Sequence, residues 1–147
     1  MRWLVACGLL IISSPLAAQS RWVVIDGEGS PTISIDMKTL KMNKKEKPGI
    51  YLVWYELTYS PPQEARDNSG NVYYVKRAKM QELVNCNDKK SILIKYIDYK
   101  KDGQVIKSND FSDILALAPL EWKDPIPDSI GEAMVEKACE YFKSNGI

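Results

Sequence analysis

The stretch Ile50–Tyr59, IYLVWYELTY, decides the fold because it is the strongest strand signal in the 147 residues. Its aromatic and β-branched side chains favour the pleated surface of a sheet over a helix. Pro48 and Gly49 form a turn signal directly before it. The stretch therefore predicts a long strand within a β-rich domain.

Further strand signals lie on both sides of this stretch. Short apolar or alternating runs bounded by turn residues predict strands over residues 22–25, 32–36, 72–86, 91–99 and 104–108. Asp102-Gly103 is a hairpin signal between the last two of these strands. Residues 61–70, with two prolines and Asn-Ser-Gly, are predicted to form a loop. Residues 111–120 fit either a short helix or an extended segment.

The last element is predicted to be a helix that begins at Ser129 and ends at Asn145-Gly146. Ser129 and Glu132 have the spacing of a capping box, and Asp128 adds negative charge where the helix dipole favours it. One helical face is apolar and comprises Ile130, Met134, Val135, Ala138, Cys139, Tyr141 and Phe142. Strands followed by one amphipathic helix predict an α+β fold. We expect a single antiparallel sheet of about six strands packed against the C-terminal helix.

Residues 1–20 have the order of a secretory signal peptide. A charged start precedes an apolar run from Leu4 to Ile12, and small residues follow as far as Ser20. The run is about half of the ~20 residues that a membrane-spanning helix needs. We predict cleavage after Ala18 or after Ser20. This leaves an exported domain over residues 21–147, located in the periplasm, at the cell surface or outside the cell. Most of the apolar core follows Cys7, so we interpret Cys7 as part of the removed signal and not as a lipidated cysteine.

The exported domain carries no net charge, because residues 21–147 hold 19 basic and 19 acidic side chains. This balance gives no general attraction for nucleic acid or an acidic membrane surface. No later apolar stretch is long enough and free enough of charge to span a bilayer. The length suits one domain with one modest core.

Two cysteines, Cys86 and Cys139, remain after cleavage. In an oxidising compartment such a pair is predicted to form a disulfide. The closed loop of ~54 residues would stabilise the domain by about 4 kcal/mol on a chain-entropy basis. Two buried free thiols are the alternative interpretation.

Catalytic chemistry has few candidates in this sequence. The chain contains no histidine, which removes Ser-His-Asp and Cys-His catalysis and the common histidine-bearing zinc sites. It has no phosphate-binding glycine loop. Asp and Glu residues are scattered, so a hydrolase with converging carboxylates is only an alternative. We predict a non-enzymatic protein without a cofactor or metal.

The main candidate binding feature is a basic segment. It consists of Lys41, Lys44, Lys45 and Lys47, with Lys38 just before it. Such a cluster suits an acidic partner, for example a glycan or an acidic protein patch. A solvated loop without a partner explains the same charges. Among the aromatic residues, Trp54 and Trp122 are expected in the core, whereas Tyr55, Tyr59 and Tyr74 fit either the core or the surface.

Several features together resemble the bacterial surface-adhesin E family. They are Ile35-Asp36 with Thr39-Leu40, the aromatic strand through Trp54, Cys86, Tyr96 and Tyr99, Asp102-Gly103, Trp122, Pro127-Asp128-Ser129 with Glu132, and Cys139. The resemblance covers most of residues 21–147. It implies an antiparallel sheet joined to a C-terminal helix by the disulfide, in agreement with the interpretation of the residues.

The resemblance also implies a binding role, because the namesake of the family is a lipid-anchored surface protein that binds host extracellular-matrix and serum proteins. This chain departs from that type in lacking a convincing lipid-attachment signal. Adhesion to host or cell-surface macromolecules is therefore one hypothesis. The other is a periplasmic envelope domain with a structural or protein-binding role, for which a homodimer formed through exposed strand edges is one arrangement.

Overall fold

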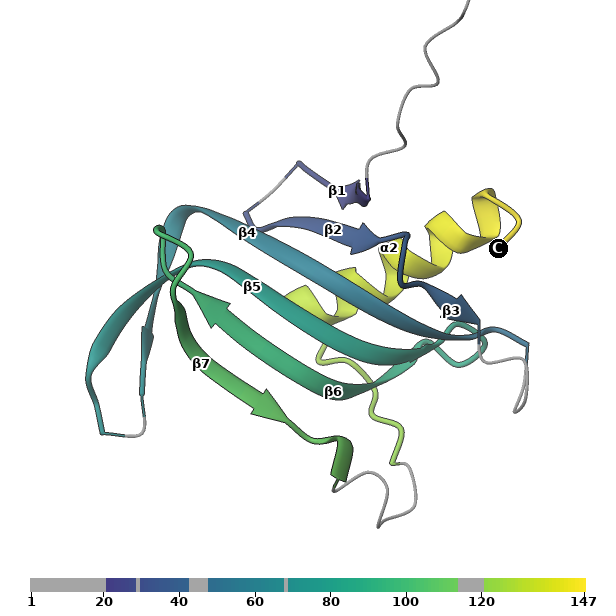
Figure 1. Cartoon of the computed structure of the whole chain (residues 1–147). Helices are drawn as coiled ribbons and strands as arrows, with labels where there is room; N and C mark the ends of the chain where they lie inside the picture. The colour runs from purple at the N-terminus through teal and green to yellow at the C-terminus, as the bar shows by residue number, and fades with distance from the viewer. Residues whose placement is uncertain (1–20, 29, 43–47, 68, 114–120) are drawn as a thin grey trace, which may run out of the picture.

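The computed structural model describes residues 21–28, 30–42, 48–67, 69–113 and 121–147. Within them lie β1 (Trp22–Asp26), β2 (Thr32–Asp36), β3 (Lys41–Met42), β4 (Ile50–Arg66), β5 (Val72–Asn85), β6 (Lys90–Tyr99), β7 (Val105–Asp110) and α2 (Ile130–Ser144). The strands form one antiparallel sheet in the order β1-β2-β4-β5-β6-β7, and β3 pairs with β4 beyond β2 (Figure 1). The prediction of one antiparallel sheet with a C-terminal helix is confirmed. The short strand β3 brings the number of described strands to seven.

The two longest strands, β4 and β5, pair along nearly their whole length, from Ile50 opposite Asn85 to Arg66 opposite Val72. The predicted loop over residues 61–70 is therefore wrong for its first part, because β4 continues to Arg66. The pairing is irregular between Thr58 and Gln63, and the two prolines lie in this interval. Proline has no N–H group for a ladder, so strands tolerate it at such irregularities.

The hydrophobic core lies between the sheet and α2, which crosses one face of the sheet (Figure 1). Alternate residues of β4 point to this face, and they are Tyr51, Val53, Tyr55 and Leu57. They meet the buried helix residues Met134, Val135, Ala138 and Phe142. The expected apolar face of the helix is confirmed except for Ile130, which is 39% exposed.

The helix begins and ends as the sequence predicts. The Ser129 hydroxyl accepts a hydrogen bond from the Glu132 amide at 3.2 Å. The Glu132 carboxylate accepts one from the Asp128 amide at 2.8 Å, so both halves of the cap are formed. Gly146 lies just beyond the last turn with φ +65°, a conformation that glycine adopts without strain.

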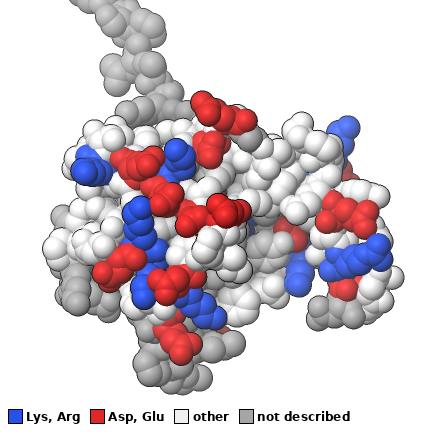
Figure 2. Space-filling view, turned by 180° about the vertical axis from the view of Figure 1, so that it is seen from behind, with Lys and Arg blue, Asp and Glu red and all other residues white. Residues whose placement is uncertain are grey.

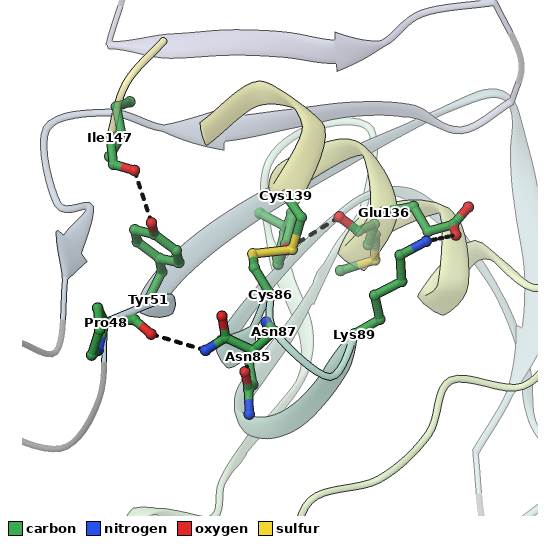
Figure 3. Close-up of a disulfide and its surroundings, with 11 residues drawn as sticks. Pro48, Tyr51, Asn85, Cys86, Asn87, Lys89, Glu136, Cys139 and Ile147 are labelled. Atoms are coloured by element: carbon green, nitrogen blue, oxygen red, sulfur yellow. Dashed lines mark hydrogen bonds and ion pairs between the residues drawn. A yellow bond between two sulfur atoms is a disulfide. The ribbon is translucent and has the colours of Figure 1, made fainter. Parts of the chain in front are cut away.

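The disulfide joins Cys86, directly after β5, to Cys139 in α2, and the two Cα atoms are 5.4 Å apart (Figure 3). Lys89 and Glu136 form an ion pair of 2.7 Å across the same junction. The Tyr51 hydroxyl donates to the Ile147 carbonyl oxygen at 2.8 Å and holds the end of the chain. The predicted disulfide is confirmed, and it fixes the helix to the end of a central strand.

The other predicted strands agree with the structure within a few residues. The Asp102-Gly103 hairpin is present between β6 and β7, with Gly103 at φ +86°. Most of the ambiguous segment 111–120 and all of the predicted signal peptide 1–20 lie outside the described residues.

Candidate functional site

The face of the sheet opposite α2 carries a group of aromatic and charged side chains. Trp54 and Glu56 alternate with the core residues of β4 and therefore point to this opposite face. Cross-strand neighbours share a face, which places Lys79, opposite Glu56, there as well. We call this group the open face, and it consists of Trp22, Trp54, Glu56, Arg77, Lys79, Ile97 and Tyr99. Figure 1 shows no helix over it.

Cations on the open face lie over aromatic rings. The Arg77 guanidinium is 4.7 Å from the centre of the Tyr99 ring, and the Lys79 ammonium is 4.8 Å from the centre of the Trp22 ring. Each such contact contributes roughly 0.5–1 kcal/mol at an exposed site. The Glu56 Oε2 atom lies 3.8 Å from Arg77 Nε and 3.5 Å from Lys79 Nζ, so one carboxylate forms ion pairs with two cations. The aromatic rings are thereby held in place and only partly exposed.

At the edge of the open face, the buried carboxylate of Asp36 organises the start of the domain. It accepts hydrogen bonds from the Arg21 guanidinium, from the Thr39 hydroxyl and from the Lys38 amide. Burial alone would raise the pKa of Asp36, but these hydrogen bonds and the charge of Arg21 lower it below its usual value. Asp36 is therefore a charged anchor for β1 and is unsuited to proton transfer near neutral pH.

A shallow hollow of about 290 Å³ lies between these groups. Its lining comprises Arg21, Trp22, Asp36, Trp54, Lys79, Ile97 and Tyr99. Partly exposed tryptophan, tyrosine and arginine are the residues that most often anchor protein interfaces. The hollow can thus seat an aromatic, apolar or anionic group of a partner, and the ion-paired side chains around it suit a polar rim.

The sequence analysis identified this site only in part. Trp54 was expected in the core, but it lies partly exposed on the open face. The expectation is wrong because the strand signal does not say which of its two faces the helix covers. Tyr55 is fully buried, and its hydroxyl donates to the Met134 carbonyl oxygen at 3.3 Å. Tyr74, by contrast, is 59% exposed.

The predicted basic segment is described at only one position. Lys41 lies exposed on β3, opposite Leu52 of β4. Lys44, Lys45 and Lys47 lie outside the described residues. Binding by this segment therefore stays a prediction. Figure 2 views the side that carries α2, and it shows acidic and basic side chains interspersed without a large area of one sign.

Two buried carboxyl groups lie on the helix side of the sheet. Burial raises the pKa of Glu82 to about 7, and a hydrogen bond from Ser91 opposes this rise. Burial also raises the pKa of Asp98, which accepts a hydrogen bond from the Tyr96 hydroxyl. The two residues lie at different positions along the paired strands β5 and β6, with Glu82 opposite Leu93 and Asp98 opposite Ala78. They do not form the close pair of carboxyl groups that glycoside chemistry uses.

The described residues contain no group of three or more His, Cys, Asp or Glu side chains that could hold a metal ion. In the same part of the chain, no helix is long and apolar enough to cross a membrane.

The chain is thus a small domain in which a disulfide ties one helix to an antiparallel sheet, and the other face of the sheet carries partly exposed aromatic rings. Residues 22–140 match the family described as surface-adhesin protein E, and the chain belongs to that family. No curated protein and no solved structure matches the chain. Family membership supports a surface-adhesin-like role and an exported, non-enzymatic protein.

Proposed function

We propose that this protein is an exported, non-enzymatic module that adheres to a host or cell-surface macromolecule through the open face of its sheet. The observation that carries the proposal is the set of partly exposed aromatic rings, Trp22, Trp54 and Tyr99, around one hollow. Cations lie over two of these rings, Trp22 and Tyr99. The outer face of an antiparallel sheet is usually polar where it meets only water. Aromatic rings held rigid on such a face suit binding, because little side-chain entropy is lost when a partner docks.

The open face also has the electrostatic character of an interface. On this face, Arg77 and Lys79 pair with the single carboxylate of Glu56, and at its edge Arg21 pairs with Asp36, which leaves a small positive excess. A partner with an acidic rim and an apolar centre would be complementary to it. Family membership supports the same role.

Replacing Trp54 by alanine is expected to weaken adhesion strongly. Loss of a central aromatic anchor costs about 2 kcal/mol or more, which corresponds to roughly thirtyfold in Kd. The measurement is binding of the purified protein to immobilised extracellular-matrix and serum proteins, with the unfolding midpoint of each variant measured in parallel. Ile126→Ala, at a residue 75% exposed outside the open face, is the matched control and should bind like the natural protein.

The predicted basic segment provides the competing explanation. A variant with Lys41, Lys44, Lys45 and Lys47 changed to glutamate belongs in the same assay. Adhesion that is lost in this variant and unchanged in a folded Trp54→Ala protein would assign binding to the basic segment and contradict the role of the open face.

Location distinguishes adhesion from the alternative of an envelope protein-interaction domain. We expect an external protease to reach the protein on intact cells, or the protein to appear in the medium. Protein confined to the periplasm and protected from protease would contradict adhesion.

A further inference from the structure

The strand β5 has a free edge beyond the end of β6. The last residue pair between these strands is Arg77 opposite Tyr99. Residues Val72–Lys76 continue past this point without a described strand partner on the β6 side, and Val72–Val75 pair with β4 on the other side. Figure 1 shows the ends of β4 and β5 leaving the sheet as a two-stranded arm. Main-chain groups on such an edge are available to pair with another strand.

A groove of about 760 Å³ adjoins this edge and the turn that follows β6. One wall is the arm, with Val72, Tyr73, Tyr74 and Lys76, and the other is the β6–β7 turn, with Lys100 and Lys101. Val72 is 44% exposed and Tyr74 is 59% exposed, so the groove offers apolar and aromatic surface to a partner. The five residues of the free edge span about 17 Å, the length of a short strand.

Apolar and basic side chains of the groove lie at different positions along β5. Val72, Tyr74 and Lys76 alternate and therefore point to one face of β5. Lys76 lies at the end nearest the β6–β7 turn, where Lys100 and Lys101 are also located. The groove thus has an apolar, aromatic end and a basic end.

The basic end has an excess of positive charge. None of Lys76, Lys100 and Lys101 forms an ion pair within the described residues. The Lys76 ammonium donates to the Tyr59 carbonyl oxygen at 2.7 Å, which fixes its position and leaves its charge in place. The nearby carboxylate of Asp102 accepts a hydrogen bond from the Gln104 amide within the turn.

We propose that this groove binds an extended acidic peptide segment, which pairs antiparallel with Val72–Lys76. The segment takes the position in the sheet that β6 would occupy if it were longer. Because β6 runs toward the groove, an antiparallel segment has its N-terminal end beside the three lysines. Acidic residues at that end and apolar residues at the other match the groove. Main-chain hydrogen bonds supply affinity, and the alternating side chains supply selectivity. The inference is independent of adhesion through the open face.

The test uses a fluorescent peptide of about six residues, Glu-Glu-Thr-Val-Thr-Val, which spans the free edge. Its binding is followed by fluorescence anisotropy, with a second peptide of reversed residue order for comparison. Changing Lys100 and Lys101 to glutamate should weaken binding about tenfold, the order expected when two surface ion pairs are lost. Both lysines lie exposed in a turn, so the variant should fold. Lys123→Glu with Lys143→Glu makes the same charge change at exposed sites elsewhere and should have little effect.

A second measurement separates strand pairing from attraction of charge. Two versions of the peptide are N-methylated at alternate residues, one at the odd and one at the even positions. Each version lacks the backbone N–H donors along one edge of the peptide strand. We expect one pattern to abolish binding and the other to preserve most of it, with amide NMR shifts at residues 72–76 only when binding occurs. Equal effects of both patterns, or equal or tighter binding of the reversed peptide, would overturn the proposal. Binding of a sulfated oligosaccharide that depends on Lys100 and Lys101, without peptide binding, would also overturn it.

Discussion

Replacing Cys86 and Cys139 together by alanine is expected to lower the free energy of unfolding by about 4 kcal/mol. The bond closes a loop with a sequence separation of 53, and on a chain-entropy basis a loop of this size stabilises by that amount. Small domains are stable by only about 5–15 kcal/mol, so the loss is a large fraction of the total. Guanidinium unfolding of the natural and variant proteins, followed by tryptophan fluorescence, measures it.

The ion pair at the same junction supplies the control for this prediction. The side chains of Lys89 and Glu136 are 64% and 42% exposed, and ion pairs in contact with solvent contribute less than about 1 kcal/mol. Lys89→Met should therefore change stability little. A double-alanine variant as stable as Lys89→Met would contradict a major role for the disulfide in holding the helix.

The second large effect is expected at Glu82, which is 6% exposed and has a pKa raised to about 7 by burial. An acid whose pKa is higher in the folded state binds its proton more tightly there than in the unfolded chain. At pH values below the unfolded pKa, near 4.5, Glu82 is protonated in both states and its raised pKa does not change the free energy of unfolding. As pH rises toward 7 the unfolded chain ionises first, so Glu82 progressively destabilises the fold, and above pH 7 the penalty is complete.

Glu82→Gln removes this titration. The gain in unfolding free energy of the variant over the natural protein should grow by about 2–3 kcal/mol between pH 5 and pH 8, because one pKa unit corresponds to 1.36 kcal/mol. The comparison of two proteins at each pH cancels the titration of the other groups. Glu121→Gln, at an exposed position, should show the same difference at both pH values. A pH-independent difference for Glu82→Gln would show that the buried carboxyl is not protonated near neutral pH.

The two proposed binding surfaces have different origins in the fold. The open face exists because α2 covers only one side of the sheet, which leaves Trp54 and its neighbours uncovered. The groove exists because β4 and β5 are longer than β6 and form the arm, which projects at the right of Figure 2. Variants at Trp54 and at Lys100 with Lys101 therefore test the two surfaces separately.

Local sequence patterns predicted most elements of the fold. Alternation and turn residues located the long strands, and Ser129 with Glu132 located the start of the helix to the residue. The continuation of β4 through Pro61 and Pro62 was missed, because proline normally ends a strand and only a partner strand can support an irregular ladder. The candidate site was predicted less well, since three of the four lysines of the basic segment are not described and the open face was not recognised.

By itself the sequence determined what depends on neighbours along the chain. The sequence shows the periodicity of strands and helix, the helix caps, the cysteine pair and the absence of histidine. Only the tertiary structure decided which side of each strand became core, and so which aromatic rings stayed in contact with water. The reason is physical: alternation gives a strand two distinct faces, but the choice between them is made by the helix that packs from far along the chain.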